Sequence, residues 1–334
     1  MTGPQEGLDV TSTTRPDGAA PSGASPSPGE VAPSGTDRAP GDGAATAAAA
    51  PHPGRTTGPD AAPTANPARP GEGPLLVALD IDGTILSHDD VLSDGVVEAV
   101  AAVRAAGHHV MLSSGRSLIA VLPVAERLGL AEGYMVCSNG SVTARFDDAS
   151  PTGYVVDEVI TFNPEGALRL LRDELPDALF AVEDVGVGFR MNDLFPHGEL
   201  DGVHRVVDFE ELWSGEVTRV VVRSPGSTSE EFSELARSLG LSDVTYAVGW
   251  SAWMDIAPLG VTKASALERV RGLLGVAPGA TVAVGDGSND IDMLRWAGRG
   301  VAMGHADPEV KEAADEVTGS IDEAGAVAVL RSLV

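Results

Sequence analysis

Asp80-Ile81-Asp82-Gly83-Thr84 directly follows the apolar run Leu75-Leu76-Val77-Ala78-Leu79. An apolar run of this length predicts a β-strand that is buried on both faces of a parallel sheet. Open α/β sheets bind ligands at the carboxyl ends of their strands, and two carboxylates stand there in this chain. Neighbouring carboxylates usually share a cation or a proton. The pentapeptide is therefore a candidate catalytic site, and an N-cap in an acidic turn is the structural alternative.

Two further predicted strands also end in polar residues. Val282-Ala283-Val284 leads into Gly285-Asp286-Gly287-Ser288-Asn289-Asp290, and Val110-Met111-Leu112 leads into Ser113-Ser114-Gly115-Arg116. A single lysine, Lys263, lies between these motifs in the sequence. Carboxylates, a hydroxyl, an amide and an ammonium group can together hold a divalent metal and a phosphate.

These motifs, in this order, resemble those of the haloacid dehalogenase-like (HAD) superfamily, and within it the Cof-type sugar-phosphate phosphatases. The resemblance covers about residues 74–334. Cys137-Ser138-Asn139-Gly140 and Met254-Asp255-Ile256-Ala257-Pro258 are further matches. Three residues depart from the family pattern: Ser114 replaces a threonine, Ala264 a glycine and His305 an asparagine.

The chemistry of phosphate esters assigns roles to the two aspartates of the first motif. Hydrolysis of a phosphomonoester needs a nucleophile, a proton donor and neutralisation of charge. Asp80 suits the nucleophile, which would form an aspartyl-phosphate, and the resemblance implies the same role. Asp82 is predicted to protonate the leaving oxygen and later to take a proton from water.

The remaining motif residues are predicted to hold a metal and the phosphoryl group. We expect Mg²⁺ against Asp80, the backbone carbonyl of Asp82 and Asp286. Asp290 would orient a metal-bound water, brace Lys263 or bind the metal directly. The residues expected to contact the phosphate or the substrate are Ser114, Gly115, Lys263 and Asn289. The structural alternatives are a surface salt bridge for Lys263, a helix N-cap for Asp290 and a turn serine for Ser114.

The chain divides into three segments by composition and pattern. Residues 1–73 are rich in Pro, Gly, Ala, Ser and Thr, which predicts a disordered tail. Strands alternate with helices over residues 74–141 and 253–334, which predicts a Rossmann-like core with a parallel sheet. Residues 142–252 have the pattern of an α+β domain with an antiparallel sheet. The resemblance implies that this insert is a cap domain.

Composition excludes several classes of partner. A formal net charge of −27 argues against binding to nucleic acid or to anionic membrane surfaces. No apolar run approaches the roughly 18 residues of a membrane span. No signal peptide is evident, so a cytoplasmic location is expected. One cysteine, Cys137, excludes an internal disulfide.

The expected function is hydrolysis of a small phosphorylated metabolite, such as a sugar phosphate, with Mg²⁺. A phosphotransferase or mutase of the same fold is the first alternative, and it would have to keep water from the aspartyl-phosphate. A catalytically silent binding protein is the second, and its mark would be the loss of Asp80, Asp82 or Asp286. All three are present. The oligomeric state is left open.

Overall fold

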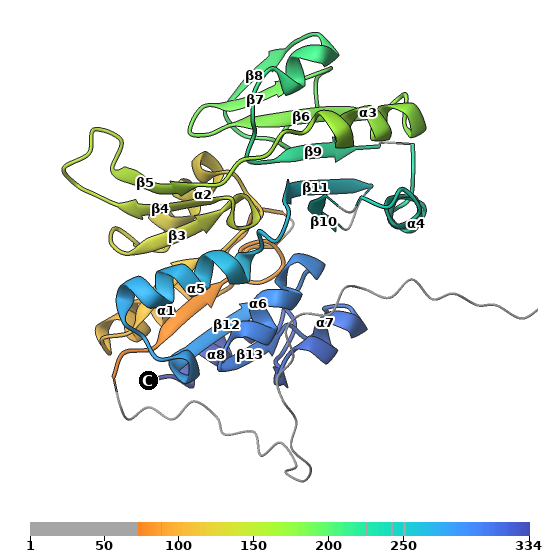
Figure 1. Cartoon of the computed structure of the whole chain (residues 1–334). Coiled ribbons are helices and arrows are strands. Elements are labelled where there is room, and N and C mark those ends of the chain that lie inside the picture. Colours follow the sequence, from red (N-terminus) through yellow and green to blue (C-terminus); the bar gives the residue numbers. More distant parts are fainter. Residues whose placement is uncertain (1–72, 88, 225, 242, 250–251) are drawn as a thin grey trace, which may run out of the picture. The chain divides into compact units, whose positions relative to one another are not determined.

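The computed structural model of the chain describes residues 73–87, 89–224, 226–241, 243–249 and 252–334 (Figure 1). The tail expected at residues 1–73 therefore lies outside the described residues, except for Gly73. Within the described part of the chain, no helix has both the length and the apolar character that crossing a membrane requires.

A five-stranded parallel sheet forms the core, as the alternation of strands and helices predicted. Its order is β14-β13-β12-β1-β2, and all neighbouring strands are parallel. These strands are β1 (Leu76–Leu79), β2 (His109–Leu112), β12 (Thr281–Gly285), β13 (Arg299–Ala302) and β14 (Glu316–Val317). Leu79, the last residue of β1, is level with Val284 of β12 and Leu112 of β2. The residues that follow these three strands therefore emerge at one edge of the sheet.

Helices cover both faces of this sheet. Successive residues of β1 face opposite sides, and because all of them are apolar, both faces are packed against helices. Val77 and Leu79 pack with α1 (Val96–Ala105), α2 (Leu118–Arg127) and α8 (Gly325–Arg331). Leu76 and Ala78 pack with α5 (Lys263–Leu274), α6 (Ile291–Trp296) and α7 (Pro308–Ala313). All four of these β1 residues are completely buried. The strand buried on both faces, predicted from the apolar run, is confirmed.

A six-stranded sheet forms the second part of the fold, in the order β10-β11-β9-β6-β7-β8. Its strands are β6 (Leu179–Asp184), β7 (Gly188–Met191), β8 (Val203–Val206), β9 (Val220–Arg223), β10 (Val244–Val248) and β11 (Trp253–Pro258). Neighbouring strands are antiparallel except β7 and β8. Helices α3 (Glu165–Glu174) and α4 (Ser229–Ser238) contribute Leu168, Leu171 and Phe232 to its apolar core. A separate α+β layer, as predicted, is present.

The strand pairing bears on the boundaries proposed for the insert, residues 142 and 252, at both ends. Strands β3 (Tyr134–Cys137), β4 (Val142–Phe146) and β5 (Tyr154–Val159) form their own antiparallel sheet. This sheet meets the end of β2 through a bridge between Ser113 and Val136, and Val142 and Ala144 pack in the core of the parallel sheet.

At the other end, β11 pairs with β9 and β10, and Met254 and Ile256 lie in the core of the six-stranded sheet. Alternating patterns predict strands but not which sheet a strand joins, because that choice depends on contacts distant in sequence. A division of the chain into two domains, with residues 142–252 as the insert, stays a proposal.

Short elements were not predicted. They are strands β8 and β14 and the 3₁₀ helices η1 (Ser138–Gly140), η2 (Phe209–Trp213), η3 (Pro278–Ala280) and η4 (Ser288–Asp290). All four residues of β8 are exposed. An exposed strand need not alternate apolar and polar residues, and its sequence, Val-His-Arg-Val, does not show the alternation that marks a half-buried strand.

Candidate active site

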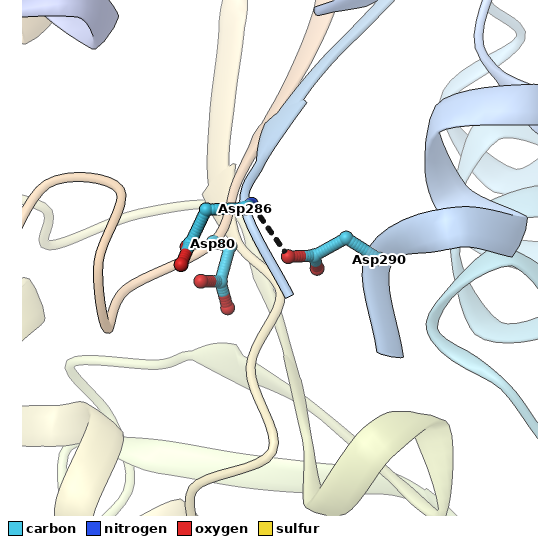
Figure 2. A group of neighbouring side chains, drawn as sticks. All are labelled: Asp80, Asp286 and Asp290. Atoms are coloured by element: carbon cyan, nitrogen blue, oxygen red, sulfur yellow. Dashed lines mark hydrogen bonds between the residues drawn. The ribbon is translucent and has the colours of Figure 1, made fainter. Parts of the chain in front are cut away.

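Three aspartates meet at the carboxyl edge of the parallel sheet (Figure 2). Asp80 follows β1, Asp286 follows β12, and Asp290 ends η4 just beyond. Each offers an oxygen, and these oxygens lie within 4.8 Å of one another. All three residues are at most 5% exposed. Residues 80 and 286, which are 206 positions apart in sequence, are therefore close enough to contact one ion.

Lys263, the first residue of α5, lies inside this group of carboxylates. Its Nζ donates to Asp80 Oδ1 and to Asp290 Oδ1, both at 2.6 Å, and the residue is completely buried. Burial alone lowers the pKa of Lys263, but the charges of Asp290 and Asp80 outweigh it and raise the pKa above its ordinary value. The ammonium group therefore stays charged, and the alternative of a surface salt bridge is wrong.

Asp290 uses both of its oxygens within the protein. Oδ1 accepts from Lys263, and Oδ2 accepts from the backbone N–H of Gly287 at 2.9 Å. Oδ2 also accepts from the backbone N–H of Asp286 at 3.0 Å (Figure 2). It therefore braces Lys263 and fixes the turn after β12. Of the roles weighed for Asp290, bracing of the lysine is the one with direct contacts.

Asp286 is held differently. Its Oδ1 accepts from the Thr84 hydroxyl at 2.8 Å, whereas its buried Oδ2 has no hydrogen-bond partner and lies 3.6 Å from His305 Nε2. Gly83 lies so close, with φ of 79°, that a Cβ there would overlap the Asp286 carboxylate. The turn in the first motif therefore requires glycine.

The charges of the site fit a divalent cation. When all three buried carboxylates are ionised, they and the one ammonium carry two negative charges in excess. Burial and the charge of Asp290 raise the pKa of Asp80 well above its usual range, although Lys263 opposes the shift. Burial, and then Asp290, raise the pKa of Asp286 to about 7. Carboxylate oxygens are preferred ligands of Mg²⁺, and the unpartnered Oδ2 of Asp286 is a suitable donor.

Mg²⁺ binding is expected to weaken as the pH falls through 7. Below that pH the metal-free Asp286 is protonated, and a cation must displace the proton, so the apparent Kd should rise by up to about tenfold per pH unit. Isothermal titration calorimetry with Mg²⁺ at pH 8, 7 and 6 measures this. An equal Kd at all three values would contradict it, and Asp286→Asn is expected to remove both the affinity and its pH dependence.

Ser114 and Gly115 follow β2 at the same edge of the sheet. Ser114 is 1% exposed, and its Oγ accepts from the backbone N–H of Arg116 at 3.1 Å. A Cβ on Gly115 would stand 3.2 Å from Asn139 Oδ1 and 3.4 Å from Asn289 Nδ2. Asn289 donates to Asn139 at 2.9 Å. The predicted phosphate-contacting residues Ser114, Gly115 and Asn289 therefore lie together, with Asn139 between two of them.

Asp82 lies apart from the acidic group. Its carboxylate forms a two-pronged ion pair with Arg116, from Nη2 to Oδ1 at 2.6 Å and from Nε to Oδ2 at 2.9 Å. The side chain is half exposed. The structure thus separates Asp82 from Asp80 although only one residue lies between them. Its predicted backbone contact with a metal stays a prediction.

Several residues of the site were not predicted individually. A cavity of about 1760 Å³ is lined by the site residues above, by Trp253 and Asp255 of β11, and by Arg219, which directly precedes β9. Asn139 and Asp255 stand in motifs that the sequence resemblance covers, which was the available signal. For Arg219, which precedes an apolar strand, the sequence held no signal.

A family model described as haloacid dehalogenase-like hydrolase matches residues 77–330. The 5-amino-6-(5-phospho-D-ribitylamino)uracil phosphatase YcsE of Bacillus subtilis is 27% identical over 272 residues, which cover 78% of this chain and 95% of the relative. The phosphoglycolate phosphatase of Archaeoglobus fulgidus is 30% identical over 260 residues, with 78% and 97% covered. Among solved structures, the HAD subclass IIB sugar phosphatase BT4131 matches with a TM-score of 0.65 at 25% identity, over 77% of this chain and 98% of that one.

Proposed function

This chain belongs to the haloacid dehalogenase-like hydrolase family, and we propose that it is a Mg²⁺-dependent phosphatase of small phosphorylated metabolites, such as sugar phosphates. The relatives named above are phosphatases of different small phosphorylated molecules, which supports the class of substrate. The observation that carries the proposal is the contact of Lys263 with both Asp80 and Asp290, beside Asp286, in a buried group of three carboxyl groups and one ammonium.

The contacts of Asp80 support its proposed role as the nucleophile. Lys263 holds Oδ1, and the Thr84 hydroxyl lies 3.4 Å from Oδ2, so the carboxylate has a fixed orientation. In the first step an Asp80 oxygen forms a bond to phosphorus while the bond to the substrate's leaving oxygen breaks. Asp82 gives its proton to that oxygen, and the alcohol leaves.

In the second step Asp82 takes a proton from water. The water oxygen bonds to phosphorus, the bond from phosphorus to Asp80 breaks, and inorganic phosphate is released. Lys263 and the Ser114 hydroxyl would donate to the phosphoryl oxygens. Mg²⁺, bound by Asp80, Asp286 and the backbone carbonyl of Asp82, would supply the remaining neutralisation of charge.

The ion pair between Asp82 and Arg116 bears on the same steps. Both Asp82 oxygens accept from the guanidinium, so proton transfer requires Arg116 to release at least one of them. A phosphate dianion is a strong competing partner for a guanidinium. Binding of substrate would therefore free Asp82, which takes up a proton from solvent before it protonates the leaving oxygen.

A phosphate-release screen tests the proposed function. We expect free phosphate from some members of a panel of phosphorylated metabolites with Mg²⁺, loss of turnover with EDTA and recovery when Mg²⁺ is added in excess. Products are also analysed for isomers, because a mutase would return an isomerised phosphate ester in place of free phosphate. Full turnover in metal-free buffer would contradict the metal requirement.

A further inference from the structure

A buried arginine directly before a strand of the six-stranded sheet contacts the loop that carries Ser114 and Gly115. Arg219, directly before β9, is 4% exposed, and its Nη1 donates a hydrogen bond to the Gly115 carbonyl. The two residues are 104 positions apart in sequence. The contact is therefore tertiary and joins two separate sheets at the proposed site of phosphate binding.

The guanidinium is held on several sides. Asp255 Oδ1 lies 3.5 Å from Nη1, and Glu183 Oε2 lies 3.8 Å from Nε. The guanidinium carbon also lies 5.3 Å from the centre of the Phe189 ring, a cation–π distance. An arginine restrained in this way has little freedom to swing away from the Gly115 carbonyl.

The two carboxylates beside Arg219 also contact the loop after β3. Glu183 Oε2 accepts from the Ser138 hydroxyl at 2.6 Å, and Asp255 Oδ2 accepts from Asn139 Nδ2 at 3.5 Å. Ser138 and Asn139 have φ of 50° and 53°, a left-handed conformation that is costly for residues other than glycine. Backbone strain of this kind persists where the surroundings hold it in place and is concentrated at functional sites.

The hydrogen-bonding capacity of the group formed by Arg219, Asp255 and Glu183 is only partly used. Arg219 Nε, Asp255 Oδ1 and Glu183 Oε1 are buried without a hydrogen-bond partner. Buried ion pairs are often replaced by apolar residues at no cost in stability, so their presence is weak evidence of a stabilising role. A functional reason for Arg219 is the better explanation.

The geometry of one peptide unit supplies that reason. The Gly115 carbonyl and the Arg116 N–H belong to the same planar peptide group. Arg219 holds the carbonyl, and the N–H donates to Ser114 Oγ at 3.1 Å. The Arg116 N–H occupies one side of Ser114 Oγ. The hydrogen of the Ser114 hydroxyl then points away from that N–H and can be donated to a phosphoryl oxygen.

We propose that Arg219 is a positioning residue of the phosphatase reaction, acting through the Gly115–Arg116 peptide group on the Ser114 hydroxyl. The inference rests on the proposed function for its catalytic consequence, but the binding of inorganic phosphate tests it without turnover. A misplacement of about 1 Å in a catalytic group can cost about a hundredfold in rate. Arg219→Met is accordingly expected to lower kcat/KM for p-nitrophenyl phosphate by about that factor.

The decisive experiment is a double-mutant cycle between Arg219 and Ser114. The affinity for inorganic phosphate, measured by calorimetry with saturating Mg²⁺, is expected to fall at least tenfold in Arg219→Met. In a Ser114→Ala background the same change should cost less than twofold, because the hydroxyl through which Arg219 acts is gone. Arg219→Lys, which keeps a charged donor, should recover part of the affinity.

Arg223→Met is the matched control, since Arg223 lies on β9, the strand that Arg219 directly precedes, and also pairs with a glutamate, Glu199, at 3.2 Å. It should leave phosphate affinity unchanged. An equal loss from Arg219→Met in both backgrounds, or a lowered Tm without a change in phosphate affinity, would overturn the inference. If Arg219→Met does not fold, the phosphate affinity of Arg219→Lys, measured in the wild-type and Ser114→Ala backgrounds, tests the inference in its place.

The wild-type result separates the two proposals. Binding of phosphate without hydrolysis of any monoester would refute the proposed function, and the cycle would still decide the role of Arg219. If the wild-type protein with Mg²⁺ bound no inorganic phosphate, the inference would fail as well, because the loop would not be a phosphate site.

Discussion

Asp80→Asn is expected to lower kcat by at least about 10⁴-fold while the protein stays folded, since loss of a nucleophile costs this much or more in enzymes with covalent intermediates. An amide cannot form the acyl phosphate. The fold should tolerate the change because asparagine has nearly the same shape. The change weakens one contact with Lys263 but also removes a buried negative charge. Burial makes that charge unfavourable, as the raised pKa of Asp80 shows, so the two effects on stability offset each other.

Turnover of the best substrate from the screen, thermal unfolding and covalent phosphate after an acid quench measure these effects. Asp173→Asn is the matched control, because Asp173 lies exposed on α3, outside the residues that line the cavity. Activity of Asp80→Asn within tenfold of the wild type would refute the nucleophile assignment. So would covalent phosphate that persists in this variant.

Lys263→Met is expected to impair both stability and activity. Removal of one member of a buried ion pair costs about 3–5 kcal/mol, because the remaining charge has no compensation. In a protein of this size that corresponds to a fall in Tm of roughly 10 °C. Loss of an electrostatic donor to the phosphoryl group should lower kcat by a further factor of about 10²–10³ in the protein that remains folded.

The cause of the instability can be tested directly. If repulsion among Asp80, Asp286 and Asp290 is responsible, Lys263→Met should lose less Tm at pH 5.5 than at pH 8. At the lower pH the buried carboxyl groups, whose pKa is raised for Asp80 and Asp286, take up protons. The added change Asp290→Asn should restore part of the Tm at pH 8.

Lys311→Met is the control, since Lys311 is the only other lysine of the chain and lies on α7. It should leave both Tm and kcat near the wild-type values. Equal losses of Tm at pH 5.5 and pH 8, with no recovery from Asp290→Asn, would show that Lys263 acts by packing its alkyl chain and not by its charge.

The sequence alone was enough to predict the parallel core and the residues at its edge. Apolar runs such as Leu75–Leu79 are typical of strands inside a sheet covered on both faces, and polar residues directly after such strands emerge at its carboxyl edge. This local logic predicted that Asp80, Ser114 and Asp286 would lie close together. It also predicted an α+β insert, because short strands and amphipathic helices carry their own periodicity.

The tertiary structure decided which partners the charged groups choose. Asp82 pairs with Arg116, Asp290 braces Lys263, and Arg219 reaches the Gly115 carbonyl from another sheet. It also assigned β4 and β5 to one sheet and β11 to another. Periodicity reports the environment of each residue, buried or exposed. The choice of partner for a charged group or a strand depends on which segments come close together in the folded chain. Those segments can be about two hundred residues apart in sequence, so local periodicity does not report them.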